Sequence, residues 1–276
     1  MAKKKRQTKT PAAVPAQVRG GRSLLFALGG AAVLAVIAAI GVAAIVLSSG
    51  GDDKGATVGA KKAVIVDQLQ LTQPGPKFIS DARATLVEAG YTVDYIAGEQ
   101  VGVETYRTLA SRDYDLVILR VHAGITTEVD ADTGEASKEE YVSLFTNEDY
   151  DESKYPEDQM NRLGKATYTN GSDAFFGIGP EFIKNIPGDF NGAQVILMGC
   201  DGLKSRRTAQ AFLDKGASAF VGWSNLVSGS FTDSATNALL NNWLPQGLTL
   251  ENAVAMTADD IGPDPAFAGE LRILTS

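Results

Sequence analysis

The chain has 276 residues, of which 44% are hydrophobic, and a formal net charge of −8. This length and composition can supply one large hydrophobic core once any membrane anchor is set aside. The charge is uneven, because residues 1–22 carry seven Lys or Arg and no acid, whereas the remainder holds 18 basic and 33 acidic groups. So acidic a body repels a phosphate backbone, and we therefore expect no nucleic-acid partner.

Residues 24–47 contain no charged or polar side chain. As a helix, this segment would reach about 36 Å and cross a hydrocarbon core of about 30 Å. The basic segment 1–23 precedes it, so the positive-inside rule predicts a cytoplasmic N-terminus. A cleaved signal peptide is the alternative, although its apolar region usually spans only about 7–15 residues. The sequence thus predicts a single-pass protein that contacts the lipid bilayer through residues 24–47 and has its main domain outside the cytoplasm.

Residues 48–62 are rich in Gly, Ser and charge, as expected of a flexible linker, and an α/β domain is predicted over 63–276. Continuous apolar runs predict buried strands of a mostly parallel sheet, with amphipathic helices between them. The predicted strands are 63–67, 92–96, 115–121, 193–199, 218–223 and 271–274. The predicted helices are 76–89, 103–109, 180–186, 204–215, 232–243 and 250–260.

Residues 124–171 form a long polar insertion after the third predicted strand. A hairpin is predicted from Ile125 to Phe145, turning near residues 132–134, where the sequence reads Asp-Thr-Gly. Insertions of this length at a strand end are usually functional or disordered.

His122 and Cys200 are the only histidine and the only cysteine of the chain. Each directly follows an apolar run, at 115–121 and 193–199. The carboxyl ends of parallel strands share one edge of a sheet, and ligands bind in the crevice there. If the two strands are neighbours, imidazole and thiol meet at this edge, and the histidine can activate the thiol as a nucleophile. The simpler reading is that the cysteine only packs in the core, as free cysteines often do.

The segments VILRVHAG at 117–124 and VILMGCDG at 195–202 resemble the caspase-like cysteine peptidases, a group that includes caspases, metacaspases, legumains, gingipains and separases. GASAFVGWSNLVS at 216–228 and GLTLENAV at 247–254 are similar to later segments of gingipain-like members. The resemblance covers about residue 63 to the C-terminus in order of elements. It implies a three-layer caspase-like fold with a mostly parallel central sheet.

The resemblance also implies roles for individual residues. His122 is the implied general base and acid, and Cys200 the implied nucleophile that forms a thioester with a peptide or protein substrate. The implied oxyanion donors are the backbone amides of Cys200 and Ala123, with Gly124 beside them. Ala123 stands where the family has glycine, but an alanine keeps the backbone N–H that the oxyanion needs. More weakly, the resemblance implies that Trp223 and Ser224 contact the substrate.

Asp201 follows the implied nucleophile, and an acidic domain attracts basic peptides, so cleavage after Arg or Lys is one hypothesis. The alternative is that the surface acids serve solubility. No cluster with metal-ligand spacing is apparent, and we expect no metal or cofactor. Besides peptide hydrolysis, the same fold could be a catalytically silent scaffold whose insertion contacts a partner, or could carry another thiol chemistry such as transpeptidation or ester hydrolysis.

Overall fold

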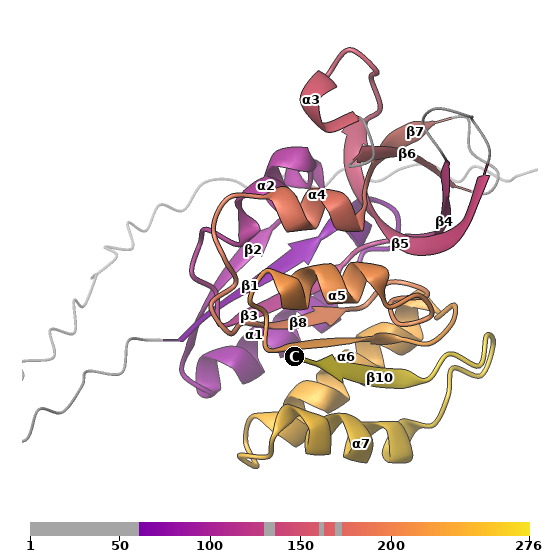
Figure 1. Cartoon of the computed structure of the whole chain (residues 1–276). Helices are drawn as coiled ribbons and strands as arrows, with labels where there is room; N and C mark the ends of the chain where they lie inside the picture. Colours follow the sequence, from indigo (N-terminus) through magenta and orange to yellow (C-terminus); the bar gives the residue numbers. More distant parts are fainter. Residues whose placement is uncertain (1–60, 130–135, 160–162, 169–172) are drawn as a thin grey trace, which may run out of the picture. The chain divides into compact units, whose positions relative to one another are not determined.

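The computed structural model describes residues 61–129, 136–159, 163–168 and 173–276 (Figure 1). The predicted basic segment 1–23, the membrane span 24–47 and most of the linker lie outside the described residues. None of the helices in the described ranges combines the length and the hydropathy that a bilayer-spanning segment requires.

The main sheet has six strands in the order β10-β9-β8-β3-β1-β2. All neighbours are parallel except β9 and β10, so the prediction of an α/β domain with a mostly parallel sheet is confirmed. The first strand begins two residues earlier than predicted, because Lys61 and Lys62 already pair with Tyr91 and Thr92. The strands are β1 Lys61–Asp67, β2 Tyr91–Ile96, β3 Leu116–Arg120, β8 Gln194–Leu197, β9 Ala219–Trp223 and β10 Leu271–Thr275.

Helices cover both faces of this sheet (Figure 1). Alternate residues of each strand point to opposite faces, so Val117 and Leu119 join one core while Leu116 and Ile118 join the other. The first core includes α2 Val103–Leu109, α4 Pro180–Asn185 and α5 Arg207–Asp214. The second includes α1 Pro76–Glu88, α6 Gly229–Trp243 and α7 Leu250–Ile261. Burial on both faces explains why the central strands are continuously apolar.

A second sheet of four strands, in the order β4-β5-β7-β6, accounts for most of the described part of the polar insertion. The predicted hairpin is confirmed, because Ile125 pairs with Val142 in antiparallel register, while its turn lies outside the described residues. The strands β6 and β7 of this sheet were not predicted. The remaining elements are β4 Ala123–Val129, β5 Ala136–Asp149, β6 Leu163–Thr167, β7 Ala174–Ile178, α3 Pro156–Gln159 and the 3-10 turns η1 Gln68–Leu71 and η2 Gly98–Gln100.

Arg120, the last residue of β3, is buried at 1% exposure and joins four parts of the fold. Its Nη1 donates to Asp67 at the end of β1 at 2.7 Å, and its Nε and Nη2 donate to both carboxylate oxygens of Asp233 on α6. Nη2 also donates to the carbonyl oxygen of Gln73 at 2.8 Å. The strand ends and the loop before α1 are therefore fixed to α6 by one cation.

We expect Arg120→Met to be strongly destabilising, because it leaves Asp67 and Asp233 without their buried cation. Removing one partner of a buried ion pair typically costs about 3–5 kcal/mol. The matched control is Lys77→Met, which deletes the exposed pair between Lys77 and Asp81 and should cost less than about 1 kcal/mol. Urea unfolding of the purified protein measures both changes. Equal stability of the two variants would contradict a structural role for Arg120.

Candidate functional site

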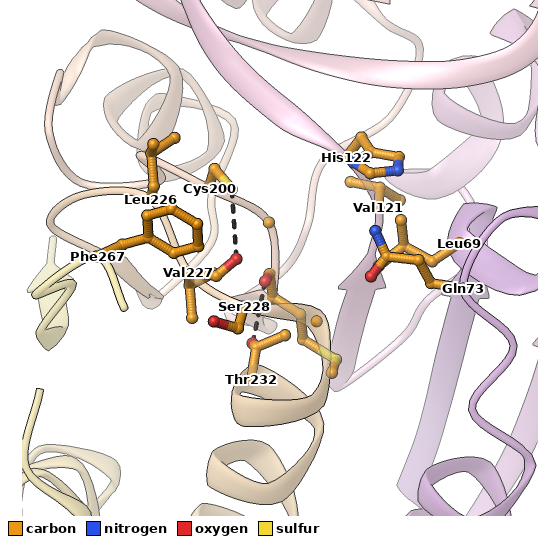
Figure 2. A pocket seen from close by; sticks show the side chains of 13 residues that line it. Leu69, Gln73, Val121, His122, Cys200, Leu226, Val227, Ser228, Thr232 and Phe267 are labelled. Atoms are coloured by element: carbon orange, nitrogen blue, oxygen red, sulfur yellow. Dashed lines mark hydrogen bonds between the residues drawn. The ribbon is translucent and has the colours of Figure 1, made fainter. Parts of the chain in front are cut away.

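His122 and Cys200 leave the same edge of the main sheet from neighbouring strands. Leu119 of β3 pairs with Leu197 of β8 in parallel register, and each of the two residues stands three positions after one member of that pair. Both line one cavity of about 270 Å³. Figure 2 shows His122 on one side of this cavity, with Leu69 and Gln73, and Cys200 on the other. The structure thus has both residues at one edge of the main sheet, as the sequence predicted.

Gly199 lets the two strand extensions approach each other closely. A β-carbon at this position would lie 2.5 Å from the carbonyl oxygen of Val121 and 2.8 Å from the β-carbon of Ala123. No side chain fits at these distances without displacing backbone. The glycine before Cys200 therefore determines how near the thiol lies to the segment that carries His122.

His122 is held from three directions. Its backbone N–H donates to Oε1 of Gln68 at 2.9 Å, and its Nε2 lies 3.4 Å from the hydroxyl of Thr72. The ring of Tyr168 meets the imidazole edge-on, with 4.9 Å between the ring centroids, and Phe145 lies 6.1 Å away. The aromatic rings come from the insertion, so the second sheet forms the wall behind the histidine.

Burial lowers the pKa of His122, and the positive charge of Arg120 lowers it further. Both effects disfavour the protonated ring, because imidazolium is poorly solvated there and is repelled by the guanidinium. The imidazole is therefore neutral at pH 7 and able to accept a proton.

Cys200 is half-buried, and its thiol donates to the carbonyl oxygen of Val227, with 3.6 Å between sulfur and oxygen. Burial raises the pKa of the Cys200 thiol; the contact with Val227 lowers it, and the carboxylates of Asp201 and Asp264 raise it again. The net rise leaves the thiol protonated at neutral pH. Within the described part of the chain, no hydrogen bond joins the thiol to His122, and Figure 2 shows the two side chains on opposite sides of the cavity, with the sulfur directed at the Val227 carbonyl.

One of the amides implied as oxyanion donors, that of Ala123, lies close to the residue before Cys200. The nitrogen of Ala123 would be 3.2 Å from a β-carbon on Gly199, the residue before Cys200. Gly124 pairs with Ser143 in the second sheet, and a β-carbon there would meet open space. Packing therefore does not require glycine at position 124.

Of the other residues predicted to contact a substrate, Asp201 lines a cavity, whereas Trp223 and Ser224 do not line either cavity at the site. Asp201 lines a second cavity of about 650 Å³, which His122 and Cys200 also border. Its buried Oδ1 accepts no hydrogen bond, and Nζ of Lys204 lies 3.4 Å away as an ion-pair partner. Trp223 is buried at 1% exposure beneath the first cavity, where its indole N–H donates to Thr232, so any influence on a substrate is indirect. Ser224 pairs with Glu270 through two hydrogen bonds beside β10.

Gln68 holds the backbone of His122, and Asn147 in turn holds Gln68. Neither residue was predicted to belong to the site. The Gln68 amide accepts from the His122 backbone and donates to Asn147 at 2.6 Å and to the Tyr168 hydroxyl at 3.0 Å. A register shift between Phe145 and Asp149 in β5 accompanies the inward position of Asn147. The pair is 79 residues apart in sequence, so no local pattern indicates it.

The arrangement can perform nucleophilic chemistry, since a neutral base and a thiol border the same cleft next to backbone amides. The sequence matches no protein-family model, and no curated protein shows significant similarity to it. The chemistry proposed for the site therefore rests on its geometry and on the short motifs around His122 and Cys200.

We expect Gly199→Ala to separate the two strand extensions and to destabilise the fold by about 1–3 kcal/mol, as overpacking does. Gly124→Ala is the matched control, because its new methyl group meets open space and should change the stability by less than about 1 kcal/mol. Thermal and urea unfolding measure the two effects. If Gly199→Ala were as stable as Gly124→Ala, the close approach at Gly199 would not constrain the site.

Proposed function

We propose that the protein is a caspase-like cysteine peptidase that hydrolyses peptide bonds through Cys200 and His122. The observation that carries the proposal is the shared cleft between β3 and β8, which the chain's only thiol and only imidazole both border. The mostly parallel sheet, covered by helices on both faces, is consistent with the fold that the resemblance implies.

In the proposed reaction, the sulfur of Cys200 attacks the carbonyl carbon of the scissile bond while His122 accepts the thiol proton. His122 then donates this proton to the nitrogen of the leaving amine as the C–N bond breaks, which leaves a thioester. Water attacks the thioester, His122 takes a proton from it, and the carboxylic acid departs as the thiol is regenerated. We assign stabilisation of the oxyanion in both steps to the backbone amides of Cys200 and Ala123, as the resemblance implies.

The resting dyad starts this reaction as a neutral pair. Because the pKa of the thiol is raised and that of the imidazole is lowered, a thiolate–imidazolium pair is not favoured before substrate binds. The thiol must also rotate away from Val227 to reach His122. Proton transfer to His122 is therefore coupled to substrate binding rather than completed beforehand.

We expect turnover of a mixed peptide library to be lost by more than about 1,000-fold in Cys200→Ser and in His122→Gln. In the native protein, kcat/KM should fall as the pH drops through the lowered pKa of His122, below the ordinary value of about 6.5, because a protonated imidazole cannot accept the thiol proton. The measurement is the rate of appearance of peptide products, identified by mass spectrometry, in buffers from about pH 4 to about pH 8. Unchanged turnover in Cys200→Ser would reject the proposal.

A catalytically silent scaffold is the second candidate. It is favoured by the hydrogen bond of the resting thiol to Val227 and by the raised pKa of Cys200, both of which suit a cysteine that only packs. A folded protein that cleaves no peptide of the library at any pH would support this candidate over the peptidase.

We also propose that residues 24–47 anchor the domain to a membrane with the N-terminus in the cytoplasm. The support is the 24-residue apolar run and the basic residues before it. Protease added outside intact cells should then digest the chain beyond residue 62 and leave a cytoplasmic tag before residue 23 intact. Immunoblotting for tags at both ends measures this, and complete protection of the C-terminal tag would contradict the orientation.

A further inference from the structure

We infer that the cavity between His122 and Cys200 selects an uncharged, apolar side chain next to the scissile bond, an inference that rests on the proposed peptidase function. The cavity is smaller than the roughly 300–1,000 Å³ typical of pockets for drug-sized ligands, so its size suits a single side chain. It opens beside the sulfur that would attack the carbonyl carbon.

Apolar side chains dominate the walls of this cavity. Leu69 and Val121 border it on the side of His122, and Val227 on the side of Cys200 (Figure 2). Met198 also lines the cavity. Leu226 and Phe267 contribute exposed apolar surface at 42% and 44% exposure. Exposed apolar groups gathered at a cavity indicate a surface that a ligand covers.

The polar groups of the cavity are mostly engaged by the protein itself. The hydroxyl of Thr232 donates to the Met198 carbonyl and accepts from the Trp223 indole, each at 3.0 Å. The backbone N–H of Ser228 donates to the carboxylate of Asp264 at 2.8 Å. Gln73 is exposed and neutral. A bound side chain therefore finds a few neutral polar groups and no fixed charge.

No Asp, Glu, Lys or Arg is among the described residues that line this cavity. Two charged groups outside its lining are held by the protein, since Arg120 is bonded to two carboxylates and Asp264 accepts hydrogen bonds from three backbone amides. An arginine, lysine or aspartate side chain would lose its hydration here without gaining a partner, whereas an apolar side chain gains from the burial.

This inference departs from the hypothesis of cleavage after Arg or Lys. Asp201 borders the other cavity, where Lys165 also contributes a positive charge, and Lys204 lies next to the Asp201 carboxylate. The Asp201 carboxylate thus has a cation beside it and lines the other cavity rather than the one between the dyad residues.

The test uses peptide acyloxymethyl ketones that differ only in the residue next to the reactive group. We expect the full-length protein to be labelled at Cys200 at least about tenfold faster by the leucine and methionine reagents than by those with arginine, lysine or aspartate. Rates come from intact-mass measurements, and peptide mapping identifies the labelled residue. Equal rates, or a faster arginine reagent, would overturn the inference.

Two substitutions provide an independent check. Met198→Asp should reverse the preference by accelerating the arginine reagent and slowing the leucine reagent, because it places a carboxylate in the cavity. Gln73→Glu should shift the preference in the same direction with little risk to folding, because residue 73 is exposed. The control is Met256→Asp on α7, where the side chain is 39% exposed and does not line the cavity. The labelling rates of all reagents should stay unchanged in this variant.

The outcomes separate this inference from the proposed function. Labelling of Cys200 that depends on His122 but shows no apolar preference would overturn the inference and leave the peptidase proposal intact. If no peptide reagent reacts with Cys200 while small iodoacetamide does, both are overturned, because the thiol is then accessible but not arranged for peptide substrates.

Discussion

The buried guanidinium of Arg120 is the interaction on which the geometry of the cleft depends. It lies two residues before His122 and binds Asp67, Asp233 and the Gln73 carbonyl, so β1, β3, the loop before α1 and the start of α6 share one fixed centre. Gly75 is required beside it, because a β-carbon there would lie 2.7 Å from Nη2. Buried ion pairs need such complete partnering, since a single missing partner leaves a desolvated charge.

Because this cation is fixed, the two sides of the cleft have different electrostatic environments. The side of His122 contains the guanidinium, which disfavours imidazolium. The side of Cys200 is near Asp201 and Asp264, which disfavour the thiolate. Each group is thus held in its neutral form mainly by burial, and the charges on its own side act in the same direction. In the proposed reaction, a substrate that excludes water and presents its carbonyl to the amides of Cys200 and Ala123 supplies the stabilisation that proton transfer requires.

The sequence predicted the strands well because β3 and β8 are buried on both faces and their apolar runs need no partner to be recognised. The placement of His122 and Cys200 followed from the same pattern. The contacts around them could not be predicted in this way, because they join residues far apart in the sequence. Gln68 and Asn147 are 79 residues apart, and Arg120 and Asp233 are 113 residues apart. The strands β6 and β7 are short, and every residue of β6 except Leu163 is polar or small, so periodicity does not separate them from loop.

In the proposed peptidase, the attraction of a substrate and the selection of the bond that is cut depend on different features. Beyond residue 22 the chain has 33 acidic and 18 basic groups, a long-range field that draws basic polypeptides toward the surface. Such a field is screened by salt within about 10 Å at 0.1 M and affects the rate of encounter more than the choice of the bond that is cut. In the proposal, that choice depends on short-range burial next to Cys200, where the cavity offers apolar walls and neutral polar groups. Under the proposed function, a basic polypeptide is therefore attracted by the surface and is still cleaved beside an apolar residue.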